Sequence, residues 1–177
     1  MNEKSEVTRF EKGVGLLRIT LGAGFLYAGL EKVLRLGGGG PFNAAGFLKF
    51  ATGGALPGSD PKAIVNPTRD FWVSLAGNAD ALSAINFLVQ FGEIAIGVAL
   101  ILGLATRFAG ICGVVMMAAF YIANWSFATG PFNEQFMYGI LAAVVAYTGA
   151  GEHYGLDEIV ERLSFVKQHP RLRFVLE

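Results

Sequence analysis

The stretch NFLVQFGEIAIGVALILGLATR, residues 86–107, decides the fold class of this chain. It is long and apolar enough to cross a bilayer as a helix, because one crossing requires about 20 such residues. Glu93 interrupts the stretch with a carboxylate. A charged side chain at that depth costs roughly 2.5 to 3.5 kcal/mol on insertion scales, so it usually faces a bundle interior, pairs with a partner or marks a substrate or proton path. Glu93 is therefore the first candidate for a functional residue.

The composition of the whole chain agrees with a membrane protein. Of its 177 residues, 53% are hydrophobic and only 16% are charged, which is unusual for a soluble domain. The formal net charge is zero and the basic residues are scattered, so nothing in the sequence indicates nucleic-acid binding. The single cysteine, Cys112, excludes an internal disulfide or a CxxC redox pair. We expect membrane lipids as partners and no nucleic acid.

Four apolar segments have the length of membrane-spanning helices, at about residues 13–36, 85–104, 108–128 and 136–150. A long loop, residues 37–84, separates the first two segments, and a tail, residues 151–177, follows the fourth. No internal repeat or second domain is visible. The sequence predicts a single all-α domain over residues 1–177, an integral membrane four-helix bundle.

The distribution of lysine and arginine predicts the orientation of the bundle. Basic residues precede the first helix, occupy the short second-to-third connection and follow the fourth helix, whereas the long loop has only three. The positive-inside rule therefore places both termini and the tail in the cytoplasm and the long loop outside. Residues 155–166 of the tail have the pattern of a solvated helix without chemistry of its own.

The long loop is expected to carry two short amphipathic helices on the outer surface. Apolar residues recur at helical spacing around residues 42–50 and again around 71–75, on either side of GGALPGSDP, residues 53–61. Two interpretations are open. The helices form a lid or docking surface over the bundle, or they form a passive interfacial loop.

Helix geometry places polar residues of all four helices at one level in the outer half of the membrane. At about 1.5 Å per residue, Glu93 lies roughly 12 Å and Lys32 about 6 to 8 Å below the outer ends of their helices. Arg18 lies near the inner end of the first helix and is expected to snorkel to the cytoplasmic interface. The other polar residues expected near the outer level are Glu31, Arg35, Asn124, Trp125, Gln135 and Tyr138.

Helical phase indicates how the first two long helices meet. Arg18 and Lys32 share one face of the first helix, and Glu93 and Gly97 share one face of the second. Glycines on these faces let the two backbones approach closely. Glu31 lies off the Arg18 face and is expected to look toward a neighbouring chain or lipid headgroups.

This polar level has two interpretations. In the first, Glu93 and Lys32 form a buried structural pair, with Asn124 and Gln135 as interhelical hydrogen-bonding residues. In the second, the level is a pocket for the head of a membrane-soluble molecule, with Glu93 as proton acceptor or donor and Trp125 and Tyr138 as walls. A quinone head suits such a pocket, because its carbonyls need hydrogen-bond donors and its reduction needs protons.

Three motifs resemble the DoxX/DoxD family of four-helix membrane proteins: RITLGAGFLYAGLEKV at residues 18–33, GEIAIGVALILGLATRFAG at 92–110 and NWSF at 124–127. The long loop is more similar to the DoxD branch. The family includes subunits of thiosulfate:quinone oxidoreductase, and other members are implicated in membrane redox complexes. The resemblance implies a prokaryotic plasma membrane protein and a quinone-dependent oxidoreductase with a sulfur-compound donor.

We expect quinone as the cofactor, and no haem, iron–sulfur cluster or nucleotide. The two histidines lie at or beyond the inner end of the fourth helix, and the sequence has no cysteine cluster and no dinucleotide fingerprint. Thiosulfate chemistry would then require a second protein subunit or direct transfer to bound quinone, with the anion attracted by Lys32, Arg35 and Lys49; a homo-oligomer is the other expected assembly. Two alternatives are a membrane anchor that recruits an oxidoreductase through Phe47 or Trp72, and a small-molecule carrier.

Overall fold

The computed structural model describes residues 3–36, 38, 40–50, 66–125, 131–151 and 155–161. The described regular elements are all α-helices, and no strand occurs among these residues, which confirms the prediction of an all-α protein. The helices are α1 (Glu3–Leu34), α2 (Ala45–Phe50), α3 (Arg69–Gly77), α4 (Ala79–Leu102), α5 (Thr106–Asn124), α6 (Glu134–Tyr147) and α7 (Asp157–Glu161).

Among the described residues, three helices are long and apolar enough to cross a membrane: Arg9–Leu34 within α1, α4 and α5. The fourth expected crossing corresponds to α6, an apolar helix of 14 residues. At 1.5 Å per residue α6 is about 21 Å long, shorter than the roughly 30 Å hydrocarbon core. These helices make the chain a membrane helical bundle.

Two of the helices extend beyond the start of the apolar segments that the sequence marks. The first helix begins at Glu3 rather than at residue 13, and α4 begins at Ala79 rather than at residue 85. The side chain of Asn78 accepts a hydrogen bond from the backbone N–H of Ala81, so Asn78 is a regular N-cap for α4. Apolar content alone missed these first turns because polar residues occupy them.

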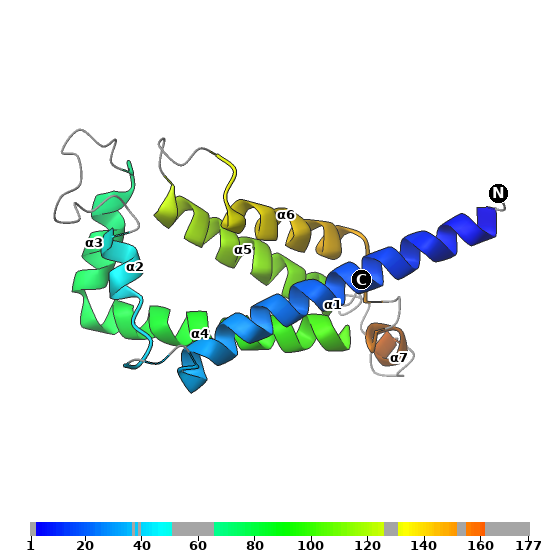
Figure 1. Cartoon of the computed structure of the whole chain (residues 1–177), viewed down its shortest axis with the longest axis horizontal. Coiled ribbons are helices and arrows are strands. Elements are labelled where there is room, and N and C mark those ends of the chain that lie inside the picture. The colour runs from blue at the N-terminus through cyan, green and yellow to red at the C-terminus, as the bar shows by residue number, and fades with distance from the viewer. Residues whose placement is uncertain are drawn as a thin grey trace.

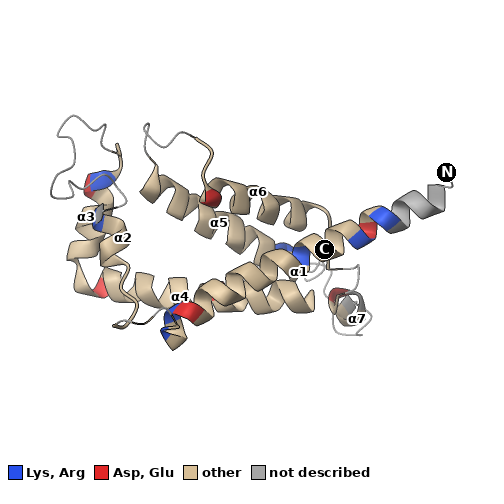
Figure 2. Ribbon diagram, in the orientation of Figure 1, with Lys and Arg blue, Asp and Glu red and all other residues tan. Residues whose placement is uncertain are grey.

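The long helices form two packed pairs, α1 with α4 and α5 with α6, which further contacts between α4 and α5 and between α1 and α6 join into one bundle (Figure 1). The short helices α2 and α3 lie at one end of the bundle and α7 lies at the other. Figure 2 shows long uncharged stretches in α4, α5 and α6. We call the α7 end the turn end, because residues 103–105 connect α4 to α5 there.

Glycines set the distance between α1 and α4, as their shared helix faces predict. A Cβ atom on Gly22 would lie 2.9 Å from the carbonyl oxygen of Gly97, and one on Gly97 would lie 2.5 Å from the backbone nitrogen of Leu26. A Cβ on Gly29 would likewise lie 2.9 Å from the backbone nitrogen of Ile94. The two backbones are thus in direct contact, which only residues without side chains permit.

Gly97→Ala is therefore expected to destabilise the protein by about 1 to 3 kcal/mol, because the added methyl meets the backbone of Leu26 and forces α1 away from α4. Thermal unfolding of the detergent-solubilised protein measures this change. Gly13→Ala is the control: Gly13 is a glycine of the partner helix α1 where the added Cβ would have no atom within 4 Å. If both variants unfold at the wild-type temperature, the close contact does not contribute to stability.

Side chains from distant parts of the chain hold both ends of α5. At its start the carboxylate of Asp157 accepts hydrogen bonds from the backbone N–H groups of Ala105 (2.6 Å) and Thr106 (3.0 Å). At its end the amide Nδ2 of Asn66 donates to the carbonyl oxygens of Ile122 (2.7 Å) and Ala123 (3.1 Å). A carboxylate at a helix start and an amide donor at a helix end each satisfy groups that the helix leaves unpaired.

The turn end corrects two expectations from the sequence. Arg18 does not reach the membrane surface: it is fully buried and donates from one guanidinium nitrogen to the carbonyl oxygen of Ala150 at 2.9 Å. The expected helix of the tail is present as α7, and its Ile159 is 60% exposed, whereas residues 162–166 lie outside the described residues. The correction concerns Asp157, which is fully buried, accepts hydrogen bonds at the start of α5 and interacts electrostatically with Arg18. The two charges remain inside the protein because each finds partners there, which local sequence does not reveal.

Candidate functional site

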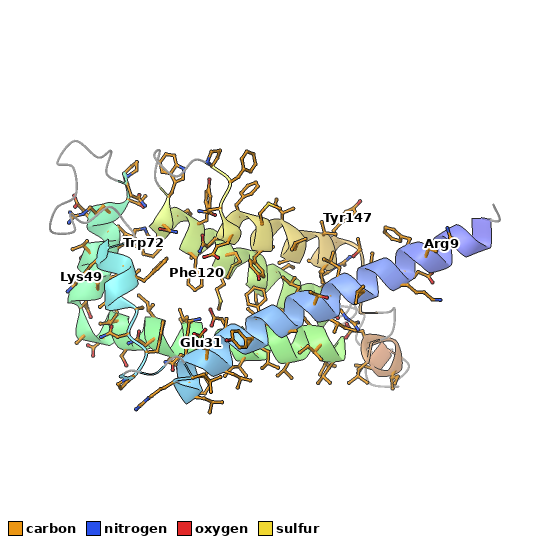
Figure 3. All side chains as sticks on the ribbon, in the orientation of Figure 1. Arg9, Glu31, Lys49, Trp72, Phe120 and Tyr147 are labelled. Carbon is orange, nitrogen blue, oxygen red and sulfur yellow. The ribbon has the colours of Figure 1, made fainter. Side chains whose placement is uncertain are left out.

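A large cavity lies between α4 and α5 and is closed at one end by α2 and α3. Its volume is about 1130 Å³, slightly above the usual range of about 300 to 1,000 Å³ for small-molecule sites. Residues of α1 and α6 complete its wall, and most of the wall is apolar. Figure 3 shows Glu31, Trp72 and Phe120, three of the wall residues, on α1, α3 and α5 around this space. The cavity therefore has the size and character of a binding site.

An ion pair between α1 and α4 forms the polar centre of the cavity wall. The Nζ of Lys32 lies 2.7 Å from Oε2 and 3.1 Å from Oε1 of Glu93, and it also donates to the carbonyl oxygen of Ala28 at 3.1 Å. The Glu93 side chain is only 4% exposed, whereas that of Lys32 is 23% exposed. Sequence reasoning expected these two residues to meet, and the structure confirms that they do. The charge that costs free energy at this depth is thus neutralised within the protein.

Further polar groups of the wall come from α6. The amide Nε2 of Gln135 donates to the carboxylate of Glu134 at 2.9 Å, and the buried Oε1 of Gln135 has no hydrogen-bond partner among the described residues. The ring of Tyr138 meets the edge of Phe25, at 6.4 Å between ring centres. Gln135 and Tyr138 therefore lie in the cavity wall, as the sequence predicted for a polar level shared by the helices.

Helices α2 and α3, with residues 42–44 and 66–68 that precede them, form a cover over one end of the cavity. The cover contacts α4 through a hydrogen bond that the backbone N–H of Ala44 donates to the side chain of Asn86 (2.8 Å). It is fastened to α5 by Asn66 and by an edge contact between Phe47 and Phe120, with ring centres 5.9 Å apart. Cover residues in the cavity wall are Phe42, Ala44, Phe47, Leu48 and Trp72.

These contacts confirm the expected two short helices and decide how they pack. The Nε1 of Trp72 donates to the hydroxyl of Thr68 at 2.9 Å, and Thr68 in turn donates to Asn66. Phe47 and Trp72, expected to dock a partner protein in the anchor interpretation, contribute to the cavity wall. The expected connection at residues 53–61 lies outside the described residues.

The model of the family described as "TQO small subunit DoxD" matches residues 14–175. The chain belongs to the DoxD family. The match includes Arg18, the Lys32–Glu93 pair, the turn at residues 103–105 and Asp157. Comparisons with curated proteins and with solved structures gave no match.

Not every residue predicted for the site of this DoxD-family protein lies in the cavity wall. Glu31 lies in the wall although its side chain is exposed, so it faces the cavity mouth as well as the surroundings. Asn124 and Trp125, the last residue of α5 and its C-cap, lie beyond the end of the wall, which α5 supplies only as far as Ala123. The depth estimate could not separate residues that are only one or two positions apart.

The sequence predicted a site whose basic residues attract an anion, but the charge of the cavity wall does not fit this prediction. Its described charged residues are three carboxylates, Glu31, Glu93 and Glu134, and one ammonium group, that of Lys32. Arg35, just beyond the end of α1, and Lys49 on α2 are both exposed and outside the wall. The wall is therefore net acidic, which disfavours a doubly charged anion and favours a neutral ligand.

Sequence reasoning did not assign several residues of the site to a cavity, although it expected Trp72 in a lid or docking surface. Trp72 and Phe120 supply aromatic wall, and Asn66 fixes the cover to α5. The only local signal for Asn66 was its position before Pro67, which is typical of a turn. No local signal could show that its amide reaches residues 56 and 57 positions further along the chain.

Proposed function

We propose that this chain is a membrane subunit of a quinone-linked redox complex of the thiosulfate:quinone oxidoreductase type, and that its cavity receives the quinone head. The observation that carries the proposal is an apolar cavity of about 1130 Å³ whose wall contains the Lys32–Glu93 pair. An apolar pocket with a few convergent polar groups is the usual form of a small-molecule site. Membership of the DoxD family supports the redox assignment.

The charges of the wall suit a quinone better than its sulfur-containing electron donor. A quinone head is neutral and presents two carbonyl oxygens, for which the Lys32 ammonium group is a hydrogen-bond donor. The net acidic wall repels a thiosulfate dianion. We therefore place oxidation of the sulfur compound outside this cavity, at a second subunit that passes its electrons to the bound quinone.

Reduction of a quinone to a quinol takes up two electrons and two protons. In the proposed mechanism the Glu93 carboxylate first takes up a proton from the aqueous side and passes it to the oxygen of the quinone as the quinone receives electrons. The Lys32 ammonium group, 2.7 Å away, stabilises the carboxylate before uptake and after transfer. The unpartnered Oε1 of Gln135 offers an acceptor for a hydroxyl group of the quinol. Glu93 regains its proton before the second transfer, so one carboxylate serves both protons.

The complex itself is tested by extracting the tagged full-length chain gently from its native membrane and analysing what co-purifies by mass spectrometry. A quinone in stoichiometric amount together with a soluble oxidoreductase is the expected result. A partner protein without quinone would favour a membrane anchor. Neither partner nor quinone would contradict the proposal, and uptake of labelled compounds into vesicles would then test a carrier.

The role of Glu93 is tested by Glu93→Gln, which keeps the shape of the side chain but removes the exchangeable proton. Thiosulfate-dependent quinone reduction in membranes is expected to fall by about 100-fold or more, the usual contribution of a general acid or base. Glu11→Gln, on α1 and outside the cavity wall, is the matched control and should retain wild-type turnover. Equal turnover of both variants, at equal amounts of folded protein, would show that Glu93 does not handle protons.

A further inference from the structure

We propose that the turn-end half of the cavity, between α4 and α5, binds the apolar side chain of the quinone, which enters sideways from the bilayer. This inference rests on the proposed function and adds to it an orientation and a route. The quinone head lies at the Lys32–Glu93 pair near the cover, and its chain runs along the two helices toward the turn at residues 103–105.

Polarity divides the walls of α4 and α5 into two halves. Beyond the ion pair, toward the turn, the cavity residues from Ala95 to Cys112 are alanine, isoleucine, phenylalanine and cysteine, without any charged or amide group. The carboxylates of Glu31, Glu93 and Glu134 and the amide of Gln135 come from the other parts of the wall. A cavity with one polar part and one apolar part selects a ligand that has a polar head and an apolar chain.

The apolar half is open on the side of the lipid. Phe108 is 56% exposed, Ile111 43% and Val115 63%, although all three contribute to the cavity wall. These residues belong to α5, a helix long and apolar enough to span the membrane, so their exposed surfaces face bilayer lipid. Ala95 on α4 is also exposed and in the wall. A chain can therefore pass between the helices without leaving apolar surroundings.

The length of this half fits a chain of several isoprene units. A Cβ on Gly92, the neighbour of Glu93, would lie 2.7 Å from the end of the Met116 side chain, so the ion pair lies near the level of Met116. From Met116 to Ala105 the helix rises by roughly 16 Å at 1.5 Å per residue. The apolar half is long enough to hold the first units of a polyisoprenoid chain, with the remainder in the bilayer.

The test compares quinone analogues that share one head group and differ only in chain length. Binding to the full-length chain in lipid nanodiscs is measured as a function of the mole fraction of each analogue in the lipid. Differences between the analogues in partitioning into the bilayer then do not affect the comparison of their affinities. Ala95→Phe fills the apolar half. Ala118→Phe is the matched control, because Ala118 is an exposed alanine of α5 outside the cavity wall.

We expect the wild type and Ala118→Phe to bind the long-chain analogue about tenfold more tightly than the chainless one, through packing of the chain against the helices. Ala95→Phe should lose this difference and keep the affinity for the chainless analogue. A difference that persists in Ala95→Phe, or that is absent from the wild type, would overturn the inference, and the apolar half would then hold only bilayer lipid. If no analogue binds saturably to the wild type, the proposed function fails as well.

A second measurement needs no variant. A quinone that carries a photoreactive group at the far end of a short isoprenoid chain should label the peptide that contains Phe108 and Ile111, and excess unlabelled quinone should suppress the labelling. Labelling confined to the cover would reverse the orientation of the ligand and contradict the inference.

Discussion

Replacing Lys32 with methionine is expected to lower the free energy of unfolding by about 3 kcal/mol. The substitution leaves the Glu93 carboxylate, 4% exposed, without its partner inside a membrane helix. Removing one member of a buried pair typically costs about 3 to 5 kcal/mol, and a lone charge at bilayer depth costs roughly 2.5 to 3.5 kcal/mol. We choose the lower part of the first range because the Lys32 side chain is 23% exposed.

Unfolding of the protein in micelles that mix a mild and a denaturing detergent measures this difference in the free energy of unfolding. The double variant Lys32→Met/Glu93→Gln should recover most of it, since neither charge then remains, and this recovery separates the ion pair from simple loss of packing. Lys12→Met, at an exposed position of the same helix, is the control and should unfold like the wild type. If Lys32→Met is as stable as this control, the pair contributes nothing to the fold.

Asp157→Ala is expected to have a similarly large effect at the opposite end of the bundle, also about 3 kcal/mol. It removes the acceptor of the backbone N–H groups of Ala105 and Thr106. Each unsatisfied buried N–H group costs about 1 to 3 kcal/mol, and loss of a negative charge at a helix start adds about 0.5 kcal/mol. Arg18 also loses a favourable electrostatic partner.

Two further substitutions identify the cause. Asp157→Asn keeps one oxygen acceptor and should be destabilised by about half as much, because it loses the charge and one of the two hydrogen bonds. Asp70→Ala removes a fully exposed carboxylate on α3 and should leave stability unchanged. Limited proteolysis should cut Asp157→Ala near residues 103–105 before it cuts the wild type. Wild-type stability of Asp157→Ala would mean that α7 is not needed to hold the start of α5.

The sequence was sufficient to predict the helices and the contact between α1 and α4. Continuous apolar runs predict the approximate positions of the four apolar helices, because a bilayer requires each backbone to satisfy its own hydrogen bonds, although the fourth, α6, has only 14 residues. Depth along the helices placed Lys32 near Glu93, and the structure confirms their ion pair. A charged side chain in an apolar run is informative because burying it in the membrane costs free energy unless it is paired. Its partner is therefore expected among the few other charged residues at that depth.

The sequence could not predict which polar residues share the cavity. Asn124 and Trp125 differ from wall residue Ala123 by only one or two positions, and a helix turns by about 100° per residue. Rotation and tilt of α5 against α4 therefore decide which of these side chains enter the wall. The helical period shows which residues share a face of a helix, but it does not show which neighbouring helix or cavity that face contacts.

The sequence by itself determined the all-α membrane fold, the close α1–α4 approach at glycines and the two short helices of the long loop. The tertiary structure alone decided that these helices cover a cavity, that Asn66 and Asp157 hold the two ends of α5 and that Arg18 is buried. The physical reason is the range of the contacts. Asp157 and Ala105 are 52 positions apart, and Asn66 and Ile122 are 56 apart. Single polar residues at such separations follow no period, so only packing of the whole chain brings them together.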